Sequence, residues 1–213
     1  MSIPKKEITS DKIKDSAKKL FTTKGYSATT IRDIAKESQV NIALINYYYR
    51  SKENLFRIIM EESFEQLFKQ IIPILNNKDT TLEEKIESLV NNYLEFLLEF
   101  PELPLFVLNE LKNNPKHLET KINLKKKVSK SSLINQIMAK NSEINPLHFV
   151  FNLLGMIVFP FIMKPVISSS KLLENEIFNQ IINERKHLIP LWMNSIFNSK
   201  TEIDIFNQIT KTK

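Results

Sequence analysis

Residues 41–55 read NIALINYYYRSKENL, and this stretch decides the fold that the sequence predicts. It places a short, aromatic-rich helix directly before a Ser-Lys-Glu helix start. Upstream, residues 28–35 read ATTIRDIA, which predicts a second short helix with a polar cap. Two short helices joined by a tight polar turn, the second able to lie in a groove, are typical of a helix-turn-helix. The stretch therefore predicts that the chain reads DNA.

The ends of these helices follow from capping residues. Residues 10–24 form the first predicted helix, and Gly25 stops it. Thr30 and Asp33 have the spacing of a capping box at the start of the second helix. Asn41 is a natural cap for the third helix, on which Ile45 and Tyr49 lie four residues apart and are expected to point inward. The capping residues therefore predict three short helices within the first fifty or so residues.

Composition favours an all-helical protein. The 213 residues include two glycines, whereas sheets and hairpins rely on glycine for tight turns. The charge is uneven, because residues 1–54 hold eleven basic and six acidic side chains and the remainder holds nineteen and eighteen. A basic first quarter on a nearly neutral body indicates a polyanionic partner at one end of the molecule.

Helical periodicity continues beyond the first quarter. The sequence predicts a long helix capped by Ser51, then further helices at residues 82–100, 103–112, 116–139, 146–167 and 172–197. We therefore expect an N-terminal DNA-binding domain over residues 1–54, and a larger helical bundle over residues 55–213.

One segment is apolar enough to raise the question of a membrane. Residues 148–167 read HFVFNLLGMIVFPFIMKPVI, but Asn152, Pro160 and Lys164 interrupt the run, and its uninterrupted part is shorter than a spanning helix needs. A helix buried in the core or in an oligomer interface is the favoured interpretation. The N-terminus has no apolar stretch typical of a signal peptide, so we expect a cytoplasmic protein with no membrane partner.

Catalytic and metal-binding patterns are missing from the sequence. There is no cysteine, and His117, His148 and His187 are widely spaced, without an HExxH or similar arrangement. No glycine-rich phosphate loop is present either. We expect neither an enzyme nor a bound cofactor or metal.

A resemblance to a known family rests on residues 10–56. The order Ile13, Ala17, Leu20-Phe21, Gly25-Tyr26, Thr29-Thr30-Ile31-Arg32-Asp33-Ile34-Ala35, Val40-Asn41, Ile45, Tyr48-Tyr49, Ser51-Lys52-Glu53 and Leu55 resembles the DNA-binding domain of TetR-family transcriptional regulators. The chain departs from the family pattern at Asn46, where an amide replaces a phenol, and at Tyr49, whose hydroxyl needs a partner.

The resemblance implies specific roles in DNA binding. Residues on one face of the third helix would meet base edges, and others would hold phosphates; the base-facing set is Ile42, Ala43, Asn46 and Tyr47, and the phosphate set is Thr30, Tyr48 and Lys52. Each has a plainer alternative: Lys52 and Asn46 as solvated surface residues, the tyrosines as packing residues, and Thr30 as a cap alone.

The resemblance also implies a homodimer on a palindromic operator. The last two long helices would form the dimer interface, with Phe159, Ile189, Trp192 and Phe197 as candidates. A small hydrophobic effector would bind in the body and release a repressor from DNA, and its candidate ligands are Tyr93, Phe96, Phe100, Phe106, Asn109, His148, Asn152 and Met156. The alternative is a DNA-binding regulator with no effector, whose body serves dimerisation or protein recruitment.

Overall fold

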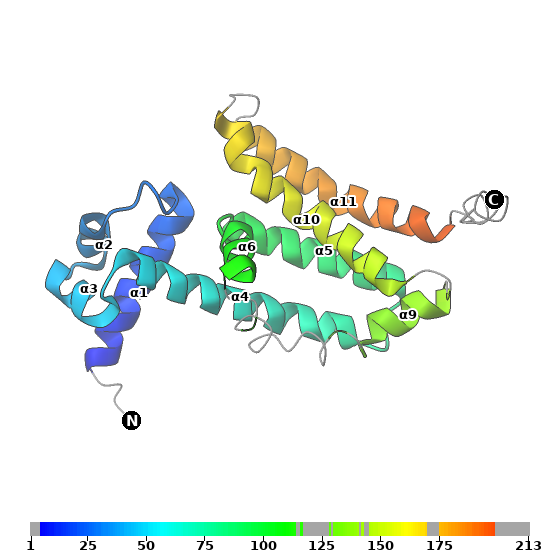
Figure 1. Ribbon diagram of the computed structural model, residues 1–213, viewed down its shortest axis with the longest axis horizontal. Coiled ribbons are helices and arrows are strands. Elements are labelled where there is room, and N and C mark those ends of the chain that lie inside the picture. Colours follow the sequence, from blue (N-terminus) through cyan, green and yellow to red (C-terminus); the bar gives the residue numbers. More distant parts are fainter. Residues whose placement is uncertain are drawn as a thin grey trace, which may run out of the picture.

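The computed structural model describes residues 5–113, 116, 128, 130–140, 142, 145–169 and 175–198, and every regular element in these ranges is a helix. The expected all-α fold is confirmed (Figure 1). The helices are α1 Lys5–Lys24, α2 Ile31–Ser38, α3 Ile42–Tyr49, α4 Lys52–Asn76, α5 Leu82–Glu99, α6 Leu103–Asn113, α9 Ser132–Lys140, α10 Pro146–Ser169 and α11 Asn175–Asn198.

The first three helices form a small domain at one end of the molecule (Figure 1). Helix α1 packs against α2, and α2 packs against α3. The side chains between them are apolar and fully buried, and they recur at the spacing of one helix face; among them are Ile13, Ala17, Ile34 and Ile45. This domain is the helix-turn-helix that the sequence predicts.

Helix α4 runs from this domain into the body (Figure 1). The Ser51 hydroxyl accepts a hydrogen bond from the Asn54 amide at 3.1 Å and so caps the helix, as predicted. The helix packs against α1 near its start and against α5 along the body. The expected domain boundary after residue 54 therefore falls within the first turn of a continuous helix, which joins the two parts.

Helix α5 is the centre of the body. Both α4 and α11 pack against it, and α10 lies beside α11 (Figure 1). Its inward face is fully buried and apolar, with Ile86, Val90 and Leu94 at helical spacing. A second capping box, between Thr81 and Glu84, starts the helix.

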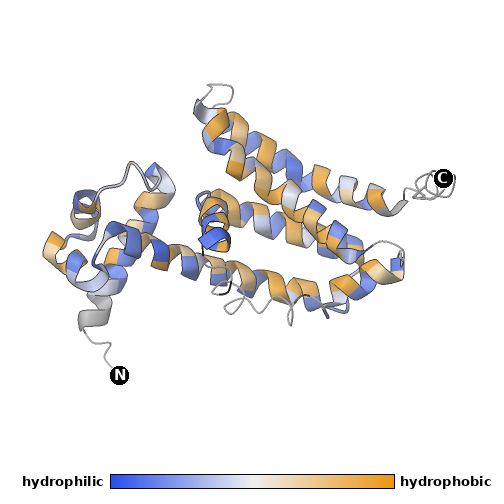
Figure 2. Ribbon diagram, viewed as in Figure 1, coloured by the Kyte–Doolittle hydropathy of each residue, from blue (hydrophilic) through white to orange (hydrophobic). Residues whose placement is uncertain are grey.

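Helix α10 is the least complete part of the core. One face, which includes Phe149, Ile157 and Phe161, is buried against its neighbours. The helix is long and apolar enough to cross a bilayer, yet only 17% of its most apolar 18-residue window is buried. Figure 2 shows hydrophobic residues along most of its length. Within the protomer the helix is thus buried on one side only, and burial of the other side in an oligomer interface stays a prediction.

Several predicted bounds shift when compared with the structure. Helix α1 begins at Lys5, five residues earlier than expected, and α10 continues to Ser169. The predicted helix over residues 116–139 is described over its last part only, where α9 begins at Ser132. Most of residues 114–129 lie outside the described residues.

Candidate nucleic-acid interface and body pocket

The link between α1 and α2 is held by a buried threonine. Gly25 ends α1 with φ of 80°, a left-handed conformation that costs glycine little. The Thr29 hydroxyl is fully buried and lies 2.8 Å from the Gly25 carbonyl oxygen and 3.3 Å from that of Leu20. These contacts tie the link to the end of α1 and thereby fix where α2 starts.

Thr30 and Asp33 form the predicted capping box. The Asp33 amide donates to the Thr30 hydroxyl oxygen at 3.2 Å, and the Thr30 amide donates to the Asp33 carboxylate at 2.9 Å. The Thr30 hydroxyl also donates to that carboxylate at 2.7 Å, and these hydrogen bonds from Thr30 hold the pKa of Asp33 below its usual value. Thr30 stays exposed at the N-terminus of α2, where the helix dipole favours an anion.

The turn between α2 and α3 uses a left-handed residue and a second cap. Gln39 has φ of 53° and ψ of 39°, which closes α2. The Asn41 side-chain oxygen then accepts the Leu44 amide at 3.1 Å, so Asn41 caps α3 as predicted. The buried Ser38 hydroxyl donates to the Ile34 carbonyl at 2.5 Å and satisfies its own polar group within α2.

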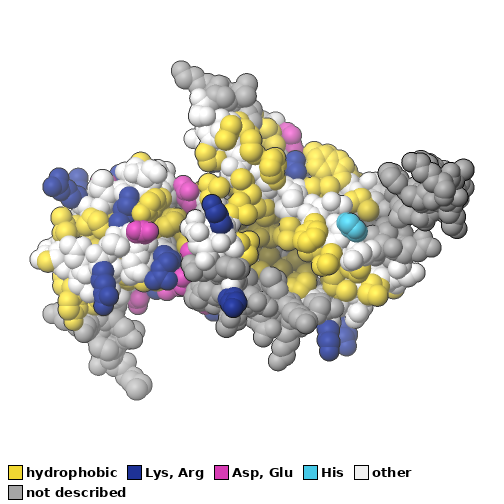
Figure 3. All heavy atoms as spheres, viewed as in Figure 1, with side chains coloured by type: hydrophobic (Ala, Val, Ile, Leu, Met, Phe, Trp, Pro, Cys, Tyr) yellow, Lys and Arg dark blue, Asp and Glu magenta, His cyan; other side chains and the backbone are white. Residues whose placement is uncertain are grey.

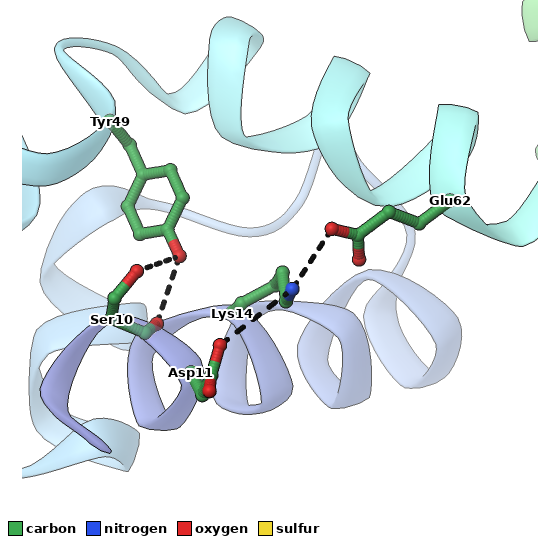
Figure 4. Close-up of polar contacts among 5 residues, drawn as sticks. All are labelled: Ser10, Asp11, Lys14, Tyr49 and Glu62. Carbon is green, nitrogen blue, oxygen red and sulfur yellow. Dashed lines mark hydrogen bonds and ion pairs between the residues drawn. The ribbon is translucent and has the colours of Figure 1, made fainter. Parts of the chain in front are cut away.

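Tyr49 fixes the inner side of α3. It is 5% exposed, and its hydroxyl donates to the Ser10 carbonyl oxygen at 2.9 Å (Figure 4). The Ser10 hydroxyl lies 2.9 Å from the same tyrosine oxygen and can donate to it, because the tyrosine proton is used in the first bond. Burial is the main cause that raises the pKa of Tyr49. The partner that this hydroxyl needs is therefore supplied by α1, thirty-nine residues away.

A neighbouring ion pair joins α1 to α4. The Lys14 ammonium lies 2.9 Å from a Glu62 carboxylate oxygen and 3.8 Å from Asp11 (Figure 4). Exposed ion pairs contribute at most about 1 kcal/mol each. The Ser10–Tyr49 contact and this pair together connect α1, α3 and the long α4.

The outer face of α3 carries the four residues predicted to meet bases. Ile42 is 40% exposed and Tyr47 is 66% exposed, and Ala43 and Asn46 are also exposed. Tyr48 is half-buried and packs edge-on against Tyr47, with ring centroids 5.2 Å apart. The structure thus brings the predicted base-facing set onto one exposed surface.

Lys52 has a structural role in addition to its predicted one. Its ammonium donates to the carbonyl oxygens of Tyr26 at 3.0 Å and Thr29 at 2.9 Å, and it lies 4.1 Å from the centroid of the Tyr26 ring. Two of its three donors are used in this way. Contact with a phosphate remains a prediction for the third.

Two exposed residues beside this surface were not predicted from the sequence. Leu44, on α3, is 38% exposed, although its apolar character suggests burial. Arg50 has φ of 64° and ψ of −44°, and the Ser51 amide donates to the Tyr49 carbonyl at 2.7 Å across it. This is a γ-turn in its rare, strained form. A positive φ at arginine has no sequence signal, so pattern reasoning could not find it.

The body contains an apolar cavity of about 310 Å³ between α4, α5, α6 and α10. Figure 3 shows hydrophobic side chains around a hollow on this face of the body. Its described walls are Phe64, Leu67, Tyr93, Leu97, Leu103, Pro104, Val107, Leu108, Leu111, Leu154, Gly155, Val158, Phe159 and Ile162. Tyr93 carries the one polar side chain among them, and burial raises its pKa to about 12.

The structure does not bring the eight predicted effector ligands together. Tyr93 lines this cavity, whereas Phe106 and Asn109 line a separate one of about 330 Å³ beside Tyr26. The other five lie in the core or on α10: Phe96 and Phe100 are buried and stacked on each other, Met156 is half-buried, and His148 and Asn152 are exposed.

The four predicted interface residues also differ in placement. Phe159 is 58% exposed and Trp192 is 39% exposed, so both are available to a partner. Ile189 is fully buried inside the protomer, against the other helices. The side chain of Phe197 lies outside the described residues. Other large apolar side chains share the exposed faces of α10 and α11: Leu147, Phe151, Leu154, Val166, Ile177, Leu188 and Leu191.

Comparison with known proteins identifies relatives of the chain. The family model of bacterial regulatory proteins of the tetR family matches residues 13–59. A Bacillus subtilis protein named "Probable HTH-type transcriptional regulator YttP" is 27% identical over 201 residues, which are 90% of this chain and 95% of that protein. The biofilm operon negative transcriptional regulator IcaR of Staphylococcus epidermidis is 32% identical over 113 residues, 53% of this chain and 58% of IcaR.

Solved structures support the fold over most of the chain. A transcriptional regulator of the TetR/AcrR family from Thermobifida fusca matches with a TM-score of 0.58 and 18% identity, over 85% of this chain and 96% of that one. The regulator FadR from Bacillus halodurans matches with a TM-score of 0.54 and 21% identity, over 89% and 96%. At these identities the likeness shows the fold alone.

Proposed function

Because the chain belongs to the TetR family of bacterial regulatory proteins, we propose that it is a homodimeric, sequence-specific repressor of transcription that a small-molecule effector releases from DNA. The observation that carries the proposal is the arrangement of α3. Its inner side is fixed by Ile45 and by the Tyr49 hydroxyl, and its outer side presents Ala43, Asn46 and Tyr47.

The exposed face of α3 has the chemistry of a major-groove reader. The Asn46 amide can donate and accept at the same time, as a bidentate contact to adenine requires. Ala43 permits close approach, and Ile42 offers a methyl contact for thymine. Thr30 and Lys52 flank the helix at helix N-termini and would hold phosphates, which set affinity and its dependence on salt.

A second copy of the chain is the proposed cover for α10 and α11. Their exposed apolar residues lie on two adjacent helices, and large exposed apolar patches mark interaction sites. A symmetric dimer buries this surface and places two α3 helices on one DNA molecule. Recovery of the protein from the membrane fraction of lysed cells would show instead that α10 meets lipid; we expect it in the soluble, cytoplasmic fraction.

Effector control follows from linkage. A ligand that binds better to a dimer with a different separation of the α3 helices weakens operator binding by the same coupling free energy. Helix α4 is the proposed transmission element, because it lines the body cavity with Phe64 and Leu67 and begins beside α3. Repression, rather than activation, is supported by the name of IcaR, a negative regulator.

The experiment that tests this function is selection of genomic fragments by the purified protein at two salt concentrations, followed by sequencing. We expect a palindromic motif that persists at the higher salt. Retention without a motif, lost as salt rises, would mean that the basic first quarter binds phosphates alone.

A further inference from the structure

Gly155 lies where the protein itself gives no reason for a glycine. It is in the interior of α10, where glycine costs about 0.5–1 kcal/mol relative to alanine. A methyl group built on it meets nothing within 4 Å, so packing among the described residues does not require its absence. The other glycine, Gly25, is explained by its positive φ. The bare backbone at Gly155 is therefore free to be approached by something else.

What lies in front of Gly155 is the body cavity, because this residue is part of its wall. An occupant of the cavity can touch the α10 backbone there more closely than at any position that carries a side chain. Leu154 and Val158, on the neighbouring positions of α10, line the same cavity with ordinary apolar groups. The glycine thus marks one wall of a binding site.

The Tyr93 hydroxyl marks the polar end of the same site. Among the described residues no hydrogen bond is made by this hydroxyl, and no other described wall residue has a polar side chain. Tyr93 is half-buried, and its hydroxyl can donate to an acceptor on a ligand in the cavity. The described walls hold no charged group, so an ionic ligand would lose its hydration with nothing to replace it.

We propose that the cavity binds an uncharged, mainly hydrocarbon molecule with one hydrogen-bond acceptor. The acceptor takes the hydrogen bond of the Tyr93 hydroxyl, and the hydrocarbon lies against the α10 backbone at Gly155. A volume of about 310 Å³ is at the lower end of the usual range for ligand pockets, so the molecule is small. This inference deepens the proposed effector control and rests on it for its regulatory meaning.

Three probes that each contain an unbranched eight-carbon chain test the ligand class by titration calorimetry: methyl octanoate, octanoate and octylammonium. We expect the full-length protein to bind the uncharged ester at least tenfold more tightly than either ion, because no described wall residue pairs with a charge. Equal or tighter binding of an ion would overturn the proposed class. Absence of ester binding would also overturn it.

Two variants test the two walls. Tyr93→Phe removes the donor and should weaken ester binding by about two- to tenfold. Gly155→Ala adds a methyl group to the cavity wall and should weaken it at least fivefold. The same change should raise Tm by about 1–4 °C, because alanine favours the helix. Asn183→Ala, on the exposed surface of α11, is the control that improves helix propensity away from the cavity and should leave ester affinity unchanged.

The outcomes separate this inference from the proposed function. Unchanged ester affinity in Gly155→Ala, with weaker dimerisation by analytical ultracentrifugation, would assign the glycine to the dimer interface and overturn its role here. Ester binding that follows the predicted pattern but leaves DNA retention unchanged would support the ligand class and contradict effector control. Motif-specific DNA binding by a protein that binds no ester would leave the regulator intact and remove this ligand.

Discussion

Helices α3 and α10 both expose large apolar side chains, but their surroundings differ. On α3 the exposed Ile42 lies beside Ala43, and the exposed Tyr47 lies beside Asn46 one turn later. The opposite side of the helix is fixed by hydrogen bonds to α1. On α10 exposed apolar residues such as Phe151 and Phe159 recur with few polar neighbours (Figures 2 and 3). The first surface mixes hydrogen-bonding and apolar groups, whereas the second is nearly all hydrocarbon.

The difference indicates two kinds of partner. Protein–DNA interfaces are wet and polar, and they form and dissociate with salt, so a rigid helix with a mixed face suits them. An almost entirely apolar face favours permanent burial, as in obligate dimers. We therefore propose that α3 makes the reversible contact with DNA and that α10 makes the lasting contact between protomers.

The largest expected effect comes from charging the α10 face. Phe151→Glu places a carboxylate in the proposed dimer interface without lining the body cavity. An unpaired buried charge costs several kcal/mol, so the dimer should dissociate and operator affinity should fall by about a hundredfold or more. Sedimentation and operator titration measure the two changes. The control is Gln70→Glu, which adds a carboxylate at an exposed position of α4. A Phe151→Glu protein that remains a dimer would contradict the assignment of α10.

Charging α3 should affect DNA alone. Ala43→Glu adds a carboxylate where the account places DNA, and like-charge repulsion should weaken operator binding by about tenfold to a hundredfold. Dimerisation and Tm should stay as they are, because Ala43 is exposed. Ala139→Glu makes the same change at an exposed position of α9 and should leave operator binding unaltered. Equal losses in both variants would show that overall charge, rather than α3, governs binding.

The hydroxyl of Tyr49 should contribute to stability. Tyr49→Phe removes its hydrogen bonds to Ser10, so the free energy of unfolding should fall by about 1–2 kcal/mol in denaturant titrations. Tyr47→Phe, on the exposed face of the same helix, should change it by less than about 0.5 kcal/mol. Similar values for the two variants would mean that the inner side of α3 is not fixed in this way.

The two capping boxes allow a matched pair of threonine variants, for which we expect the smallest changes in stability. Thr30→Ala and Thr81→Ala should each lower the free energy of unfolding by about 1 kcal/mol, since each removes a cap. Weaker operator binding with an unchanged salt dependence is expected for Thr30→Ala alone, because Thr30 is the proposed phosphate contact and carries no charge. If Thr81→Ala weakens DNA binding as much, Thr30 acts through helix stability only.

The Thr30 box also predicts a dependence on pH. Its hydrogen bonds depress the pKa of Asp33 in the folded state. The stability that they add is present above about pH 4, the unfolded value, and is lost as pH falls through the folded value. Thr30→Ala should therefore flatten the acid limb of a plot of unfolding free energy against pH, whereas an unchanged acid limb would contradict the role of the box.

The sequence predicted best where short-range chemistry determines structure. Thr30, Asn41 and Ser51 cap helices where their spacing indicated, and the inward positions of Ile45 and Tyr49 followed from the helical period. The γ-turn at Arg50 was not predictable, because arginine has no preference for positive φ.

Predictions for the body were weaker because its sites depend on packing between distant helices. Phe96, Phe106 and Met156 have similar apolar character in the sequence, yet they lie in a core, in a second cavity and on a half-buried helix face. Burial of Ile189 in the protomer, with Trp192 exposed one turn away, likewise depends on the way α11 meets α5. Helical periodicity identifies a buried stripe but does not identify which neighbour covers it.

The most direct test of the account is a methylation-interference footprint of the wild-type dimer on the motif recovered from genomic selection. The account predicts two sets of major-groove contacts, centred about 34–36 Å apart, on one face of the duplex and related by the symmetry of the palindrome. A single set of contacts, or binding with no interference at major-groove positions, would contradict the claim that two copies of α3 read the operator.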